Sequence, residues 1–278
     1  MAVLFALLAS ACGGCADFLG GVASRRLPAV VVVAVSQSAG LAVAVGVVLV
    51  TQPGSEHPVD LMWAVGAGVC MVLGLVSFYS ALAVGTMGVV APISALGVLV
   101  PVLWGIALLG EAPSRLALGG AALGIAGVVL ASGPELSGQV AGRSIVLAVI
   151  AGAGFGSATV FIAEAAPGGV AWTVLILKLT VVVLTVPALL HHRHAFAEVP
   201  RLWLALVTLA IGAIDVSGIL LLAYAMTLGL VSLVGVVASL YPIVTVLLAF
   251  WVLRERMQRV QQIGAVVAFA GVALLALG

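Results

Sequence analysis

Long apolar segments, separated by short polar breaks, fill almost the whole of this chain. A segment of about 20 apolar residues is what an α-helix needs to cross about 30 Å of hydrocarbon. Because the breaks between the segments are short, nearly all of the chain is expected to lie in a bilayer. We predict an all-α membrane protein with ten transmembrane helices, at residues 3–24, 28–51, 61–84, 88–109, 115–132, 143–164, 170–190, 202–227, 231–253 and 258–277.

The composition excludes several classes of protein. Of 278 residues, 64% are hydrophobic and 7% are charged, against about 25% charged residues in an ordinary soluble domain. In lipid, the outside of a protein can be as apolar as its inside. A formal net charge of +1 offers no basic surface for nucleic acid. We therefore expect the lipid bilayer as a partner, no nucleic acid, and no room for a soluble catalytic domain.

The second half of the chain repeats the first half at an offset of 144 residues. Five predicted helices fall in each copy, at 1–134 (helices 1–5) and 142–278 (helices 6–10). Because five is odd, the second copy enters the membrane from the opposite side. Many secondary transporters build a midplane site between two such inverted repeats. The matched positions include Glu111 with Glu255, Arg115 with Arg259, Gly120 with Gly264, and Ala126-Gly127-Val128 with Ala270-Gly271-Val272.

Three charged residues fall inside predicted helices: Asp17, Lys178 and Asp215. A charge at the centre of a bilayer costs about 2.5–3.5 kcal/mol on insertion scales, so such side chains usually face a cavity or a partner. Lys178 and Asp215 flank the polar break at 191–201, one on each side. At 1.5 Å of rise per residue, both lie about 18–21 Å from the same membrane surface. Their matching depth makes an ion pair between them feasible.

Two roles are open for these charges. The pair can merely neutralise itself and lock two helices together, or one or more of the charges can bind substrate or carry a proton. We favour the second role for Asp17, Lys178 and Asp215, because two leucines would lock helices at a lower cost. Asp17 also shares one helix face with Ser10 and Ser24, at a spacing of seven residues, which is typical of a cavity wall.

Other polar residues inside the predicted helices are weaker candidates for the wall of a cavity. For any single one of them, a hydrogen bond between helices is the better explanation. These weaker candidates are Gln37, Ser77, Tyr79, Ser80 and Tyr241.

Prolines and glycines predict irregularities in the helices. Pro92, Pro101 and Pro242 predict kinks or breaks in the segments 88–109 and 231–253, where freed carbonyl groups can line a site. Glycine spacing at Gly152 and Gly156, and at Gly120 and Gly124, predicts close contacts between helices.

Chemical motifs of enzymes are weak in this sequence. The CxxC spacing at 12–15 lies in a membrane helix without the βαβ pattern of a redox domain. The glycine-rich stretch at 152–156 follows no strand and leads into no phosphate cradle. We expect no catalytic residues, no metal ligands, no cofactor and no enzyme activity.

Several of these stretches resemble the EamA-type branch of the drug/metabolite transporter superfamily. The resemblance covers nearly the whole chain, as two EamA units at 1–134 and 142–278. It rests on Gly13-Gly14-Cys15-Ala16-Asp17-Phe18-Leu19-Gly20-Gly21 with Arg25-Arg26, on Leu109-Gly110-Glu111 before Arg115, on Ser239-Leu240-Tyr241-Pro242 with Val252-Leu253-Arg254-Glu255-Arg256, and on Gly264 with Gly271-Val272.

The resemblance implies a ten-helix basket around a central cavity, formed mainly by helices other than the fifth of each repeat. It implies transport of amino acids, related metabolites, nucleotide precursors or toxic compounds, often outward, without ATP hydrolysis. Glu111 and Glu255 match the glutamate of the family, and we interpret both as structural caps of helix ends near the water interface.

The orientation in the membrane has two conflicting indications. Both termini lie on one side when the helices number ten, and the resemblance places them in the cytoplasm. The loops on the opposite side hold nearly all of the arginines, and by the positive-inside rule this puts both termini outside. The charge count is the indication that we follow. The arginines on that side are Arg25, Arg26, Arg143, Arg193, Arg201, Arg254, Arg256 and Arg259, whereas the side of the termini holds Arg115.

The prediction for function is a secondary active transporter of the inner membrane. It would export a small metabolite, an amino acid-like compound or a drug, by alternating access, with one carboxylate as a candidate proton carrier. The chain would act as a monomer or a weak homodimer. The alternatives are a non-transporting scaffold or accessory subunit, which has no use for two symmetric gates, and a lipid-modifying membrane enzyme, which needs a cluster of His, Asp and Glu near one interface.

Overall fold

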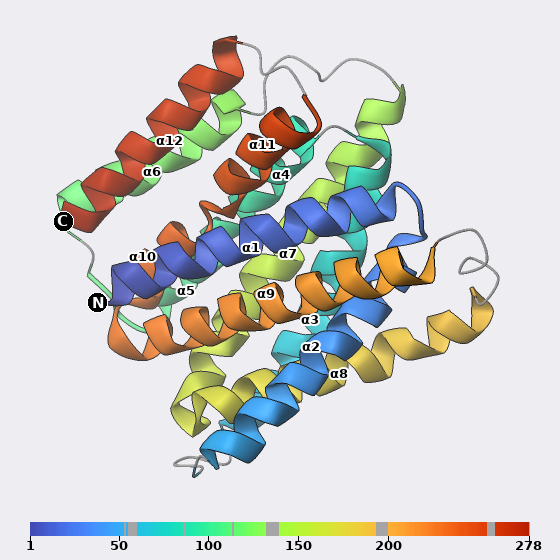
Figure 1. Ribbon diagram of the computed structural model, residues 1–278. Helices are drawn as coiled ribbons and strands as arrows, with labels where there is room; N and C mark the ends of the chain where they lie inside the picture. The colour runs from blue at the N-terminus through green and yellow to red at the C-terminus, as the bar shows by residue number, and fades with distance from the viewer. Residues whose placement is uncertain are drawn as a thin grey trace.

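The described part of the protein is helical throughout (Figure 1). The computed structural model describes residues 1–52, 54, 60–85, 87–112, 114–131, 139–192, 200–254 and 259–277. Its α-helices and 3₁₀ turns, in chain order, are α1 (Ala2–Ser24), α2 (Ala29–Thr51), α3 (Leu61–Val84), α4 (Met87–Ala95), η1 (Leu96–Val98), α5 (Leu99–Ala107), α6 (Arg115–Ala131), α7 (Gln139–Ala165), η2 (Ala166–Gly168), α8 (Val170–His191), α9 (Arg201–Leu228), α10 (Val231–Ala238), α11 (Tyr241–Val252) and α12 (Arg259–Leu277).

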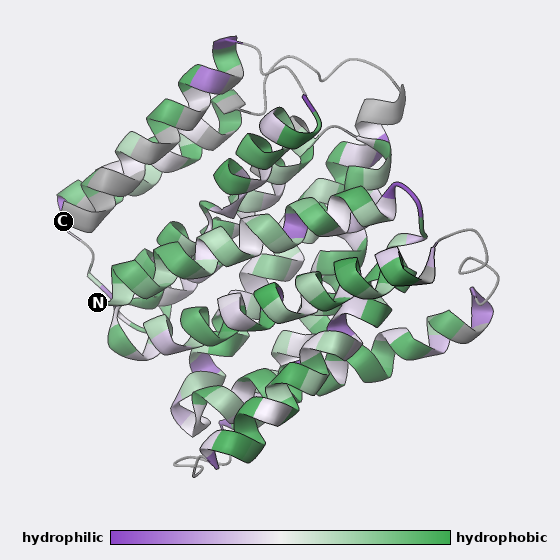
Figure 2. Cartoon of the chain, in the orientation of Figure 1, coloured by the Kyte–Doolittle hydropathy of each residue, from purple (hydrophilic) through white to green (hydrophobic). Residues whose placement is uncertain are grey.

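The helices carry the surface of a multi-pass membrane protein. Hydrophobic residues run along their length, and hydrophilic residues gather mainly toward the ends of the helices (Figure 2). Among the described residues, seven stretches are long and apolar enough to cross a membrane, namely Ala2–Ser24, Ala29–Thr51, Leu61–Val84, Gly142–Gly168, Val170–Leu189, Leu202–Leu228 and Val231–Val252.

Three of the ten predicted spans are not among these seven. The segment 88–109 is divided into α4, η1 and α5, and its apolar helical part is the shorter stretch Ile93–Ala107. The segment 115–132 forms α6, which has only 17 residues. The segment 258–277 forms α12 (Arg259–Leu277).

Two of the predicted spans are interrupted at the positions that the prolines indicated. The segment 88–109 changes to a 3₁₀ turn at η1, just before Pro101, and the segment 231–253 is interrupted between α10 and α11, just before Pro242. Proline has no N–H, so Pro101 and Pro242 cannot donate to the carbonyl groups of Gly97 and Ala238, four residues earlier. By contrast, α4 continues through Pro92.

The helices pack in pairs that relate the two halves of the chain. Helix α1 packs along α9, α3 along α7, α2 along α8, and α6 along α12. Figure 1 shows α6 and α12 side by side at one edge of the molecule. In chain order, α1, α2, α3 and α6 of the first half correspond to α7, α8, α9 and α12 of the second half. If each helix is replaced by its counterpart, the α1–α9 pair becomes the α7–α3 pair, which is also present. The α2–α8 and α6–α12 pairs are unchanged by the exchange.

Glycines permit the closest of these contacts, as their spacing predicted. A Cβ on Gly156 would overlap the carbonyl of Gly97, and one on Gly152 would lie 2.6 Å from the carbonyl oxygen of Ser94. The backbones of α7 and the α4–η1 segment therefore touch. A Cβ on Gly271 would lie 2.6 Å from the Gly120 carbonyl oxygen, so α12 and α6 are also in backbone contact.

Most of the basic residues of the helix ends lie on one side of the bundle, whereas Arg115, the first residue of α6, lies on the side of the termini. Figure 1 shows the N-terminus and the end of α12 at the same end of the molecule. The described arginines at 25, 26, 143, 201, 254 and 259 stand at the opposite end, at the end of α1, in the first turns of α7, α9 and α12, and after α11. There the guanidinium of Arg26 stacks 4.9 Å from the ring centre of Trp203. Arg193 and Arg256 lie outside the described residues.

Candidate functional site

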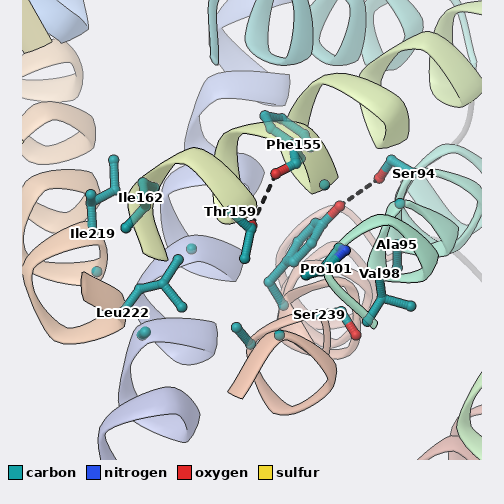
Figure 3. Close-up of a pocket in the computed structure, with 18 of the residues that line it drawn as sticks. Ser94, Ala95, Val98, Pro101, Phe155, Thr159, Ile162, Ile219, Leu222 and Ser239 are labelled. Atoms are coloured by element: carbon teal, nitrogen blue, oxygen red, sulfur yellow. Dashed lines mark hydrogen bonds between the residues drawn. The ribbon is translucent and has the colours of Figure 1, made fainter. Parts of the chain in front are cut away.

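A cavity of about 140 Å³ lies between helices from both halves of the chain. In the described structure, α2, α6, α8 and α12 contribute no residue to its wall. Figure 3 shows labelled residues of the wall, among them Ser94, Phe155 and Thr159. The lining residues are Ala9, Gly13 and Asp17 of α1; Met71 and Leu75 of α3; Ser94, Ala95, Gly97, Val98 and Pro101 of α4, η1 and α5; Phe155, Gly156, Thr159 and Ile162 of α7; Asp215, Gly218, Ile219 and Leu222 of α9; and Gly235, Ala238, Ser239 and Tyr241 of α10, α11 and the break between them.

Both interrupted segments reach the cavity at their breaks. Gly97 and Pro101 line it from the first half, and Ala238 and Tyr241 line it from the second. Gly97 and Ala238 have carbonyl groups that lack an α-helical donor because a proline stands four residues later. Both are residues of the wall. Interrupted helices at a midplane site are a recurring feature of secondary transporters.

Asp17 is a buried carboxylate on the cavity wall, 8% exposed. Within the described residues it takes part in no hydrogen bond and no ion pair. Small residues on its helix bring α1 close to its neighbours: a Cβ on Gly14 would lie 2.5 Å from the carbonyl oxygen of Tyr241, and one on Gly20 would overlap the Tyr79 ring. The carboxylate is therefore held between packed helices and faces the cavity without a partner.

Lys178 and Asp215 form the ion pair that their matching depth made feasible. The Lys178 ammonium is 0% exposed, and its Nζ also donates to Gln37 Oε1 at 2.5 Å. Gln37 Nε2 in turn donates to Asp215 Oδ2 at 2.8 Å. The cluster joins α2, α8 and α9, and in the described structure Lys178 and Gln37 both bind the Oδ2 atom of Asp215.

The three predicted charges are placed differently with respect to the cavity. Asp17 and Asp215 line it, whereas Lys178 is fully buried and is not a residue of the wall. The Lys178 side chain neutralises Asp215 from a position outside the cavity. Of the three charges for which we predicted a role in substrate binding or proton transfer, Lys178 is thus the one that does not line the cavity.

Of the weaker candidates, Tyr241 lines the cavity. Its hydroxyl forms a hydrogen bond of 2.8 Å with the Ser94 hydroxyl, which joins α11 to α4 (Figure 3). Gln37 acts through the Lys178 cluster, and Tyr79 is buried against α1. Gln37, Ser77, Tyr79 and Ser80 are not residues of the wall.

Several residues of the wall carried no signal in the sequence. The ring of Phe155 meets Tyr241 edge to face, with 6.2 Å between the ring centres. The hydroxyl of Thr159 donates to the Phe155 carbonyl at 2.9 Å, and that of Ser239 donates to the Val236 carbonyl at 2.7 Å. Ordinary Phe, Thr and Ser residues in apolar helices are too common to be singled out, and only their position marks them.

Glu164 is a further acidic residue of a membrane helix that the sequence analysis did not select. It stands in the last turn of α7, and its Oε1 accepts a hydrogen bond of 2.9 Å from Trp104 Nε1 of α5. The bond ties α7 to α5 near one end of the bundle, away from the cavity wall.

Glu111 caps a helix of the opposite half of the chain. Its two carboxylate oxygens accept hydrogen bonds from the backbone N–H groups of Val231 (2.6 Å) and Ser232 (3.0 Å). These are the first two residues of α10, whose N–H groups have no partner within the helix. The interpretation of Glu111 as a structural cap is confirmed by these bonds, and Glu255 lies outside the described residues.

Comparison with protein families agrees with this architecture. The EamA-like transporter family matches the chain twice, over residues 1–133 and 142–277. The chain belongs to the EamA-like transporter family. No curated protein matches it.

A solved crystal structure has the same fold as this EamA-like transporter. It superposes with a TM-score of 0.76, covering 99% of this chain and 96% of the other, at 20% sequence identity. At this identity the likeness shows the fold alone.

Proposed function

We propose that this EamA-like protein is a secondary active transporter that exports a small metabolite, an amino acid-like compound or a drug. The observation that carries the proposal is the cavity between the two halves of the chain. Its wall holds a buried carboxylate, Asp17, that has no partner among the described residues, beside a second carboxylate, Asp215. A buried charge of this kind inside a membrane protein is the usual mark of a substrate or ion pathway.

The packing of the helices supports alternating access by two inverted repeats. In this proposal the protein has ten spans, with α4–η1–α5 as one span and α10–α11 as another. The pairing of α1 with α9 and of α3 with α7 is what a two-fold relation between five-helix halves produces. Rocking of one half against the other would open the cavity to one side of the membrane at a time.

Asp17 is our candidate for proton coupling, and Asp215 for substrate binding. A proton and a substrate that compete for neighbouring carboxylates exchange across the membrane without ATP. The proposal places the protein in the inner membrane, as a monomer or weak homodimer, with no enzymatic step.

The test is metabolite profiling of cells that overproduce the wild type, Asp17→Asn or Asp60→Asn. Asp60 precedes α3 and is not a residue of the cavity wall, so its substitution removes the same charge elsewhere. We expect one compound to accumulate in the medium with the wild type and with Asp60→Asn, and to fall at least tenfold with Asp17→Asn.

Equal export by all three variants would show that Asp17 has no part in transport. Accumulation inside the cells instead of outside would reverse the direction that we propose. Expression and membrane insertion are compared by immunoblot, so that loss of protein is not mistaken for loss of transport.

A further inference from the structure

We infer that the cavity selects small organic cations, amines carried on an apolar body, and rejects organic acids. The inference rests on the proposed transport function and specifies its substrate class. The sequence alone left amino acids, organic acids and cationic drugs open, because it offered two carboxylates and one lysine. The structure separates these classes by showing which charges reach the cavity.

The charges that reach the wall are negative. None of the described lining residues is a lysine, arginine or histidine, whereas Asp17 and Asp215 both line the cavity. Lys178 balances Asp215 from outside the wall. Asp17 is therefore the carboxylate of the wall that no cation among the described residues balances.

The neutral polar groups of the wall offer a ligand hydrogen-bond acceptors but few unused hydrogen-bond donors. The hydroxyl protons of Thr159 and Ser239 are directed to backbone carbonyls, and the hydroxyls of Ser94 and Tyr241 bind each other. In the described structure Asp215 Oδ1 has no hydrogen-bond partner, since both of its partners bind Oδ2. An ammonium group, which is a donor only, matches this set.

The rest of the wall is apolar and sized for a compact body. Met71, Leu75, Phe155, Ile219 and Leu222 contribute hydrocarbon or aromatic surface. The volume of about 140 Å³ is close to that of an engineered cavity of about 150 Å³ that holds one benzene molecule. A single ring or a short branched chain bearing an amine fits these dimensions.

Organic acids and zwitterions fit less well. A carboxylate would meet two carboxylates, and the described residues of the wall offer it no cationic partner. The ammonium group of a zwitterion would find an acceptor in the wall, but its carboxylate would find no cationic donor among the described lining residues. The ranking expected from the wall is cation, then neutral molecule and zwitterion, then anion.

Three ligands of nearly equal shape and different charge test this ranking. Purified full-length protein in lipid nanodiscs is titrated with benzylamine, benzyl alcohol or benzoate, and the shift in melting temperature gives the apparent affinity. We expect benzylamine to bind at least tenfold more tightly than benzoate. Asp17→Asn should reduce the benzylamine affinity at least tenfold, and Asp60→Asn should leave it unchanged.

The inference is overturned if benzoate binds as tightly as benzylamine, if none of the three ligands shifts the melting temperature, or if Asp17→Asn retains the affinity of the wild type. The comparison among the three ligands uses the wild type, so it stands even if a variant does not fold.

Reconstitution in liposomes separates this inference from the proposed function. If benzylamine binds in an Asp17-dependent manner but is not moved across the membrane, the selectivity stands and the transport function fails. If the compound exported by cells is an organic acid, transport stands and the selectivity fails.

Discussion

At the scale of single residues, the buried ammonium of Lys178 depends on one carboxylate for its charge balance. It is 0% exposed and bound to Asp215 and Gln37. Removing one member of such a pair leaves an uncompensated buried charge, which costs about 3–5 kcal/mol. We expect Asp215→Asn to lower the free energy of unfolding by about this amount, measured by denaturant titration in mild detergent.

The matched comparison is the double variant Lys178→Met with Asp215→Leu. Apolar residues of similar volume often replace a buried pair without loss of stability, so we expect the double variant to be as stable as the wild type but to lose transport, because Asp215 is our candidate for substrate binding. If the double variant transports at the wild-type rate, then the Lys178–Asp215 pair only holds the helices together and has no part in transport.

At the scale of helices, Glu111 connects the loop after α5 to the first turn of α10. Loss of a capping side chain costs about 0.5–2 kcal/mol. We expect Glu111→Ala to destabilise the protein by this amount, measured as a fall in melting temperature. Asp60→Ala is the control, because Asp60 stands at the N-cap of α3 without a capping hydrogen bond. An equal loss in both variants would contradict the cap.

The contact between α7 and the α4–η1 segment leads to a second prediction at this scale. A Cβ on Gly152 would lie 2.6 Å from the Ser94 carbonyl oxygen, whereas a Cβ on Gly46 in α2 meets nothing within 4 Å. Overpacking costs about 1–3 kcal/mol. We expect Gly152→Ala to be destabilising by this amount and Gly46→Ala to be nearly neutral, as measured by thermal unfolding. A neutral Gly152→Ala would show that the helices separate easily there.

At the scale of the whole molecule, the arginines predict the orientation in the membrane. Except for Arg115, the described arginines gather at the end opposite to the N-terminus and the end of α12. The positive-inside rule then places both termini outside the cytoplasm. We expect a C-terminal alkaline phosphatase fusion to be active and a C-terminal green fluorescent protein fusion to be dark. A fluorescent C-terminus would reverse the orientation.

Much of this architecture follows from local properties of the sequence. The length of each apolar segment determines whether a helix can cross a bilayer, and proline chemistry places the breaks near Pro101 and Pro242. The depth of Lys178 and Asp215 follows from the constant rise of a helix, which is why residue counts alone could show that an ion pair between them is feasible.

Tertiary structure decided which of these residues reach the cavity. The rotation of each helix about its axis and the choice of its neighbours depend on packing across the whole chain, so they leave no local signal. For this reason Asp215 faces the cavity while Lys178, at a similar depth, lies outside its wall. Phe155 and Thr159 became residues of the wall for the same reason. The sequence by itself determined a helical membrane protein with buried charges, and packing determined that Asp17 and Asp215, and not Lys178, line its cavity.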